Sequence, residues 1–170
     1  MTIGVQHLML EVERVRDAFQ QAVFQAADLQ AAMATVAADC TLVQLPVGTG
    51  ATGIDGLRRY LDEDLLPHLP ADLSFCRVSR TVDRWRVVDE TSIAFTHDRE
   101  LPWLLPRVPA TQRRAEVLAI SVVSVRRSRI TALRTLWDHA TLLTQLRLDA
   151  SDLPPTIRSR TSSAEPSARC

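Results

Sequence analysis

The hydrophobic pattern of the sequence changes its period once, near Pro70, and this change restricts the folds open to the chain. Before Pro70, apolar residues recur at spacings of three and four, which is the repeat of amphipathic helices. Three helices are predicted there, over residues 12–26, 29–39 and 54–69. After Pro70, runs rich in β-branched and aromatic residues predict strands. A helical part followed by strands in series is typical of the α+β class.

The predicted strands form a single sheet. One strand lies within the helical part, four follow Pro70, and a helix over 139–148 closes the pattern; the strands are 40–46, 73–83, 85–97, 115–125 and 130–138. The run 115–125 is the most apolar, which places it at the centre of the sheet. A strongly bent antiparallel or mixed sheet wrapped around the N-terminal helices leaves an apolar pocket, where a small-molecule site is expected.

Length and composition predict one domain over residues 1–150 and a disordered tail over 151–170, which is rich in Ser, Pro, Thr and Arg. The 20 basic residues are all arginine and balance 20 acidic residues. Without lysine, the chain has neither Schiff-base chemistry nor a Walker A loop. Zero net charge and few aromatic residues argue against nucleic-acid binding. No apolar run is long enough to span a membrane, so a soluble, cytoplasmic protein is expected.

No metal or cofactor is expected, because the four histidines lack the spacing of paired ligands; they are His7, His68, His97 and His139. The cysteines form no paired motif either. Cys40 and Cys76 are predicted to be free thiols that pack as small hydrophobic residues.

A glycine-rich turn is the first candidate site. Gly48-x-Gly50-x-x-Gly53 follows a predicted strand and precedes a predicted helix, which is the setting of a dinucleotide-binding loop. A flexible strand-to-helix turn explains the same glycines. The strands that follow are in series rather than in repeated βαβ units, which argues against the nucleotide interpretation.

Trp137-Asp138-His139, at the end of the last predicted strand, is the second candidate. Burial in an apolar pocket raises the pKa of a carboxyl group, so that Asp138 could act as a general acid or base near neutral pH. The alternative is that Asp138 caps the closing helix, a position at which aspartate is favoured. The sequence leaves both roles open.

The third candidate is the dense ionisable group His97-Asp98-Arg99-Glu100, which is followed by Trp103. His97 titrates near neutral pH and could carry protons. Arg99 could bind a carboxylate or enolate oxygen, and Trp103 could form a pocket wall. The alternative is a solvated loop with weak internal ion pairs.

Three stretches between Phe19 and Leu148 together resemble the SnoaL-like branch of the NTF2-like superfamily. They are Ala27-Asp28-Leu29 with the following Ala38–Leu42, the loop from His97 to Thr111, and Trp137-Asp138-x-x-x-Leu142-Leu143-x-Gln145-Leu146. The chain departs from the family pattern where glycine is usual; these positions hold Gln112, Ser128 and Arg147.

The resemblance implies a cone-shaped barrel with a deep apolar pocket, a homodimer, and a small apolar carbonyl-containing substrate of secondary metabolism. It implies cofactor-independent acid/base chemistry, such as aldol-type cyclisation, isomerisation or epoxide opening. Asp138 matches the acid/base of the cyclases, with His97 assisting. The substrate-binding residues implied are Arg99, Asp98, Trp103, Tyr60 and Trp137.

Two observations limit this interpretation. Limonene-type epoxide hydrolases of the superfamily position their water with Asn and Tyr, whereas this chain has no asparagine and only one tyrosine. The superfamily also contains non-catalytic modules, because a fold does not determine an activity. A small-molecule-binding or dimerisation module of the same fold is therefore the alternative function.

Overall fold

The computed structural model describes residues 3–149 and 151–153. Its helical elements are α1 (Ile3–Phe24), α2 (Leu29–Ala34), α3 (Ile54–Arg59), the π-helix η1 (Tyr60–Leu65), the 3₁₀ helix η2 (Leu66–His68) and α4 (His139–Leu146). Its strands are β1 (Val36–Gln44), β2 (Thr49–Thr52), β3 (Ser74–Val82), β4 (Arg86–Thr96), β5 (Arg114–Arg126) and β6 (Arg129–Trp137). The predicted α+β class is confirmed.

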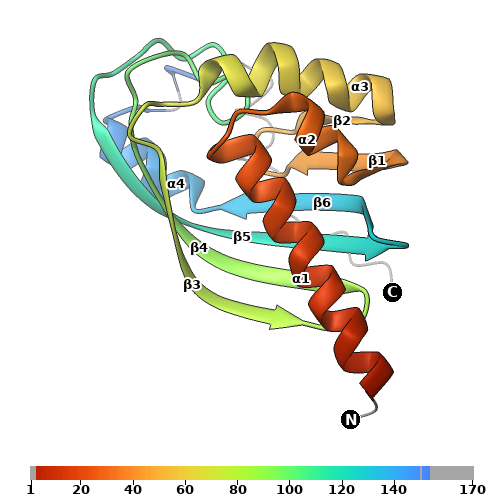
Figure 1. The fold of residues 1–170 in the computed structure, drawn as a ribbon. Coiled ribbons are helices and arrows are strands. Elements are labelled where there is room, and N and C mark those ends of the chain that lie inside the picture. Colours follow the sequence, from red (N-terminus) through yellow and green to blue (C-terminus); the bar gives the residue numbers. More distant parts are fainter. Residues whose placement is uncertain (1–2, 150, 154–170) are drawn as a thin grey trace, which may run out of the picture.

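The strands form one mixed sheet in the order β2-β1-β6-β5-β4-β3. Strands β3 to β6 are a continuous antiparallel meander, as the strands in series predict, and β1 joins β6 in parallel. The sheet bends strongly (Figure 1). It does not close into a barrel, because β2 and β3 are its edges. The bend produces the concave face that the resemblance implies.

Strand β5 lies inside the sheet, and its residue pattern shows which face of the sheet is buried. Its residues alternate strictly between buried and more exposed positions, which is the pattern of a strand with one face on the core. The inward residues include Val117, Ala119 and Val123, each at most 3% exposed. Residues of β4 and β6 paired with them, such as Ile93 and Leu133, share this inward face.

Helix α1 crosses the concave face of the sheet (Figure 1) and contacts strands β3 to β6. Its buried stripe contains Val12, Phe19 and Val23. These spacings of seven and four keep the residues on one helical face. The predicted helix is confirmed, but it begins earlier than expected, at Ile3, and ends at Phe24.

The predicted helix over 29–39 is wrong in its second half. Helix α2 ends at Ala34, and Val36–Asp39 belong to β1. Val36 pairs with Ile130 of β6, and the Ile130 amide donates to the Thr35 carbonyl at 2.8 Å. Helix propensity is a weak preference, which pairing with a distant strand overrides here.

The structure also bears on the predictions for the cysteines, the C-terminal segment and membrane-spanning helices. Cys40 is buried as predicted, whereas Cys76 is exposed, which corrects the prediction for that residue. Leu153 is 3% exposed and belongs to the buried cluster. The rest of the predicted tail, 154–170, lies outside the described residues. None of the helices in the described part of the chain is long and apolar enough to cross a membrane.

Candidate functional site

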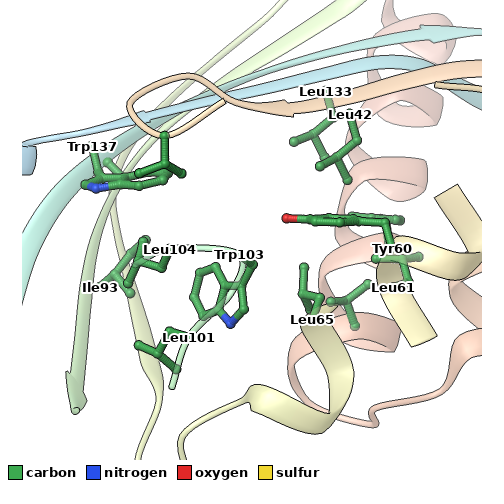
Figure 2. Packing of buried hydrophobic residues seen from close by; sticks show 14 of the residues in the cluster. Leu42, Tyr60, Leu61, Leu65, Ile93, Leu101, Trp103, Leu104, Leu133 and Trp137 are labelled. Atoms are coloured by element: carbon green, nitrogen blue, oxygen red, sulfur yellow. The ribbon is translucent and has the colours of Figure 1, made fainter. Parts of the chain in front are cut away.

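A largely apolar cavity lies between α1 and the concave face of the sheet. Its empty volume is about 680 Å³, including the part open to solvent. Five aromatic side chains line it, namely Phe19, Phe24, Phe75, Trp103 and Trp137. Figure 2 shows part of this interior, with Trp137 on one side and Trp103 and Leu104 nearby. A concave, mostly apolar space with few polar groups is the usual form of a small-molecule site.

Arg16 brings a charge into this apolar lining. It lies on the same face of α1 as Val12, Phe19 and Val23, and it is only 7% exposed. Its Nη1 donates to Gln20 Oε1 at 2.7 Å, and Nη2 donates to Ser121 Oγ at a longer 3.5 Å. Burial lowers the pKa of Arg16, and the charge of Asp89 opposes this effect. Arginine nevertheless stays protonated in proteins, so the cavity holds a buried cation.

Asp89 is the counter-ion, but it is held mainly by a second arginine. Arg80 donates to Asp89 Oδ1 at 2.6 Å and to Oδ2 at 2.9 Å. Arg16 Nε lies 3.3 Å from Asp89 Oδ2 and finds no hydrogen-bond partner in residues 3–149 and 151–153. Arg80 therefore satisfies Asp89, and Arg16 is the cation whose hydrogen-bonding capacity is less fully used.

Asp17 extends this network to the surface. Arg80 also donates to both carboxylate oxygens of Asp17, at 3.1 and 2.7 Å. The Asp17 side chain is 55% exposed, compared with 4% for Asp89. The four residues Asp17, Arg80, Asp89 and Arg16, called the ionic network below, thus lead from solvent to the cavity.

A wider opening between α1 and the β3–β4 edge adjoins the cavity at this network. The two spaces share lining residues, among them Arg16, Gln20 and Thr91. The opening has an empty volume of about 800 Å³, including solvent, and is also lined by Arg77 and Asp89. This opening is a polar space that adjoins the apolar interior.

The two tryptophans predicted to bind substrate both line the cavity. Trp137 Nε1 donates to His139 Nδ1 at 3.2 Å. Trp103 Nε1 donates to the carbonyl of His68 at 3.3 Å, and its own carbonyl accepts from Thr49 Oγ1 at 2.9 Å. These bonds hold both rings in place and satisfy their buried polar atoms.

Tyr60, the first residue of η1, is 5% exposed. Figure 2 shows its hydroxyl pointing into the interior, toward Trp137 and Leu104. Burial raises the pKa of Tyr60 to about 12, and side-chain hydrogen bonding with Thr49 and Gln44 opposes this effect. Tyr60 is not among the residues that line the cavity; it lines a separate opening together with Thr49 and Pro102.

Asp138 does not face the cavity, and the capping alternative is the one that the structure shows. The residue is exposed and precedes α4. It accepts from the backbone N–H of Thr141 at 3.0 Å and from its hydroxyl at 2.7 Å. These hydrogen bonds lower the pKa of Asp138. The expectation of a raised pKa in a dry pocket is wrong, because Trp137 takes the inward position at the end of β6 and the residue after it points to the other face.

His97 and its charged neighbours Asp98 and Arg99 differ in their exposure to solvent. His97 is fully buried, and its Nδ1 accepts from the Thr111 amide at 3.3 Å, but it is absent from the cavity lining. Burial lowers the pKa of His97, opposed by Asp98. Asp98 and Arg99 form a partly exposed ion pair at 2.9 Å, also outside the lining. The solvated-loop alternative therefore describes Asp98 and Arg99.

The glycine-rich turn has a structural explanation. Gly50 lies in β2 and pairs with Val43 of β1 at a φ of +132°. A Cβ at Gly50 would lie 2.0 Å from the Leu42 carbonyl oxygen, so the close approach of β1 and β2 requires glycine here. The strands flanking this turn pair antiparallel, unlike the parallel βαβ unit of a dinucleotide loop.

The ionic network was not predicted from the sequence. One signal for it was available, because Arg16 interrupts the apolar stripe Val12, Phe19 and Val23. A charge on the buried face of an amphipathic helix indicates a buried partner. Asp89 and Arg80 lie on separate strands and gave no such signal.

No protein-family model and no curated protein matches the sequence. Solved structures do match the fold. A candidate SnoaL-like polyketide cyclase from Jannaschia sp. CCS1 is 15% identical, with a TM-score of 0.64 over 86% of this chain and 95% of that one. The fold is NTF2-like. This confirms the expected fold, and identity at this level carries no activity from one chain to the other.

Two further solved structures of similar fold have been named for different activities or folds. An epoxide hydrolase of the LEH-like type from M. tuberculosis is 17% identical, with a TM-score of 0.61 over 82% of this chain and 91% of that one. A hypothetical protein with a ketosteroid isomerase-like fold from Catenulispora acidiphila, solved with trimethylamine, is 16% identical. Its TM-score is 0.60 over 82% of this chain and 97% of that one.

Proposed function

We propose that this NTF2-like protein binds a small apolar molecule in the cavity and holds a carbonyl or carboxylate oxygen of that molecule on Arg16. The observation that carries the proposal is the buried guanidinium of Arg16 in a cavity lined by five aromatic rings. Because Arg80 already satisfies Asp89 with two hydrogen bonds, Arg16 can turn donors to a ligand without leaving that carboxylate unpaired.

The physical chemistry favours a ligand that is apolar with one negatively polarised oxygen. Hydrogen bonds from a charged donor are roughly twice as strong as neutral ones, and low local dielectric strengthens them further. The aromatic lining favours a flat apolar body. Trp103 and Trp137, predicted from the sequence to contact substrate, are proposed here as walls for that body.

Binding of 2-naphthoate, compared with the neutral 2-naphthamide, tests this function. Tryptophan fluorescence should show that the protein prefers the carboxylate, and Arg16→Met should remove the preference, weakening naphthoate binding roughly 10- to 100-fold. Arg99→Met is the matched control, because the Arg99 side chain is 41% exposed and outside the cavity lining. Equal binding of both probes by the unaltered protein would contradict the proposal.

A second candidate function is acid/base catalysis on an apolar carbonyl compound of secondary metabolism, by cyclisation, isomerisation or epoxide opening. One observation favours it, namely the Asp89 carboxylate beside Arg16 at the opening of the cavity. Asp89 would remove a proton next to the carbonyl group, and Arg16 would stabilise the enolate oxygen. No cofactor enters this chemistry.

Deuterium exchange into 2-tetralone, followed by NMR in D₂O, separates catalysis from binding alone. A catalyst of enolisation exchanges the protons next to the carbonyl group faster than buffer does, and Asp89→Asn abolishes the acceleration. Asp138→Asn distinguishes the two carboxylates, since the exposed helix cap should leave the rate unchanged. If Asp138→Asn lost the acceleration and Asp89→Asn kept it, Asp138 and not Asp89 would be the acid/base group.

We also propose that the protein forms a homodimer through the outer face of the sheet. Leu118, Ile120 and Leu136 are 41–50% exposed there, and Ile120 pairs directly with Leu136. Glu90 borders this strip on β4 and Arg134 borders it on β6. A twofold axis through the strip brings the acidic border of one copy to the basic border of the other.

Sedimentation equilibrium tests the dimer. The protein should sediment as a dimer, and Leu136→Glu should sediment as a monomer with an unchanged circular dichroism spectrum. Val78→Glu is the control, because Val78 is 58% exposed on the edge strand β3. A monomeric mass for the unaltered protein at micromolar concentration would exclude this arrangement.

A further inference from the structure

A row of polar side chains crosses the concave face of the sheet beside Arg16. Ser121 of β5 pairs with Thr135 of β6, and Thr135 pairs in turn with Gln44 of β1. All three residues line the same cavity as Arg16, and they are called the polar row below. On its other side, Ser121 pairs with Asp89 of the ionic network. The polar row therefore continues the network across the floor of the cavity.

The three strands interrupt their apolar inward faces at the same level of the sheet. The buried positions of β5 hold alanine and valine, except at Ser121. In β6, Thr135 stands between Leu133 and Trp137, which also line the cavity. Polar groups on a core face cost free energy unless they are hydrogen-bonded. Their coincidence on neighbouring strands indicates a shared partner inside the cavity.

The polar row has hydrogen-bonding capacity left for a ligand. The Ser121 hydroxyl accepts from Arg16 Nη2 at 3.5 Å and still has its own proton to donate. The Thr135 hydroxyl forms no hydrogen bond within the described part of the chain. The amide of Gln44 lies within hydrogen-bonding reach of the Tyr60 hydroxyl. Because an amide has two N–H donors and a carbonyl acceptor, one hydroxyl does not saturate it.

Apolar surfaces flank the polar row on both sides. Figure 2 shows Leu42 and Leu133 on one side of the interior and Trp137 on the other. Leu133 and Trp137 lie two residues before and after Thr135, so all three side chains share one face of β6. The row is thus a narrow polar strip between apolar walls. Such a surface fits a flat apolar molecule that carries oxygen atoms along one edge.

The register of the strands sets where the ligand oxygens must lie. Neighbouring strands are about 4.8 Å apart, so Gln44 is about 10 Å from Ser121 across the sheet. Since Arg16 contacts Ser121, a ligand oxygen held by Arg16 lies at the β5 end of the row. A second oxygen that reaches Thr135 and Gln44 must then lie farther along the same edge of the ligand.

We propose that Thr135 and Gln44 hydrogen-bond a second oxygen of the ligand, on the same edge as the oxygen held by Arg16. This inference rests on the proposed function, in which Arg16 holds the first oxygen. The Thr135 hydroxyl and the Gln44 amide can both donate to a carbonyl oxygen, and either can also accept from a hydroxyl. The ligand class is a flat apolar carboxylate or ketone with a hydroxyl or carbonyl group farther along that edge.

Two isomeric hydroxynaphthoates, compared with 2-naphthoate by tryptophan fluorescence, test this inference in the full chain. The hydroxyl and the carboxylate share one long edge of the rings in 7-hydroxy-2-naphthoate and lie on opposite edges in 6-hydroxy-2-naphthoate. The protein should bind the 7-hydroxy compound roughly tenfold more tightly than 2-naphthoate. The 6-hydroxy compound should gain nothing, because its hydroxyl points away from the polar row when its carboxylate is on Arg16.

Variants of the polar row identify the groups responsible. Thr135→Val and Gln44→Met, which remove the polar groups at similar size, should each weaken the preference for the 7-hydroxy compound. The double variant should abolish it and keep the affinity for 2-naphthoate. Thr135→Ser retains a hydroxyl and should retain the preference. Thr131→Val is the matched control, because Thr131 lies on the same strand and outside the cavity lining.

The outcomes separate this inference from the function beneath it. If 2-naphthoate fails to bind, or binds without need of Arg16, the proposed function fails and the inference falls with it. If 2-naphthoate binds through Arg16 but the unaltered protein binds both hydroxynaphthoates equally, only the inference is overturned. The same holds if the double variant, folded by circular dichroism, keeps the preference for the 7-hydroxy compound.

Discussion

The ionic network and the exposed pair Asp98–Arg99 contain the same chemical groups in different surroundings. In the network, the side chains of Asp89, Arg16 and Arg80 are 4%, 9% and 12% exposed. Asp98 and Arg99 are 32% and 41% exposed. Both pairs have contacts near 3 Å, so distance does not distinguish them. Water screens the exposed pair, whereas the buried charges depend on one another.

The capacity of a charged side chain to bind a ligand depends here on how far its surroundings exclude water. At the exposed Arg99, water competes with any approaching ligand oxygen for the N–H donors of the guanidinium group. Arg16 has already lost most of its water, so a ligand oxygen restores hydrogen bonds that burial removed. The same guanidinium group is therefore a candidate binding group at position 16 and a solvated one at position 99.

Removal of Asp89 is expected to have the largest effect. Asp89→Ala leaves the buried Arg16 without its counter-ion and Arg80 with Asp17 alone, which should cost about 3–5 kcal/mol in the free energy of unfolding. Asp98→Ala, at the exposed pair, should cost at most about 1 kcal/mol. Urea unfolding followed by circular dichroism measures both. Similar losses in the free energy of unfolding for the two variants would contradict the expected difference between buried and exposed ion pairs.

The pH dependence of stability is expected to show the next largest effect. Burial lowers the pKa of both His97 and His139. Below a pH of about 6.5 the unfolded chain takes up protons that the folded protein does not. The equilibrium constant for folding should then decrease as the pH falls, by at most about tenfold per pH unit for each histidine.

Variants at the histidines check this pH dependence. His97→Gln keeps an acceptor for the Thr111 amide and removes one titrating group, so stability should fall less steeply below pH 6.5. His7→Gln, at an exposed position of α1, should leave the slope unchanged. A slope that is identical in all three proteins would show that buried His97 does not take part.

Asp138→Ala is expected to have the smallest effect. It removes two hydrogen bonds to Thr141 at the start of α4, so the urea midpoint should fall by less than in Asp89→Ala. Asp138→Ser, which also caps helices well, should restore most of the loss. Naphthoate binding should stay unchanged in both variants. Weakened binding in the Ser variant would place the carboxyl group at the site after all.

The class of the fold and most of its elements follow from local patterns in the sequence. Alternation in β5 and the stripe of Val12, Phe19 and Val23 are local patterns, and they predict the strand, the helix and their buried faces. Even the capping role of Asp138 was available as an alternative, because capping depends on residues only a few positions apart.

The position of the site depends on contacts between residues that are distant in the sequence. The parallel pairing of β1 with β6 turned the second half of a predicted helix into a strand. The contact of Arg80 with Asp89 depends on the pairing of β3 with β4 across a bulge, and that of Arg16 depends on how α1 crosses the sheet. Burial of a charge is set by elements distant in the chain. The run from His97 to Glu100 stands out in the sequence, whereas Arg16, Arg80 and Asp89 meet only when the sheet bends around the helix.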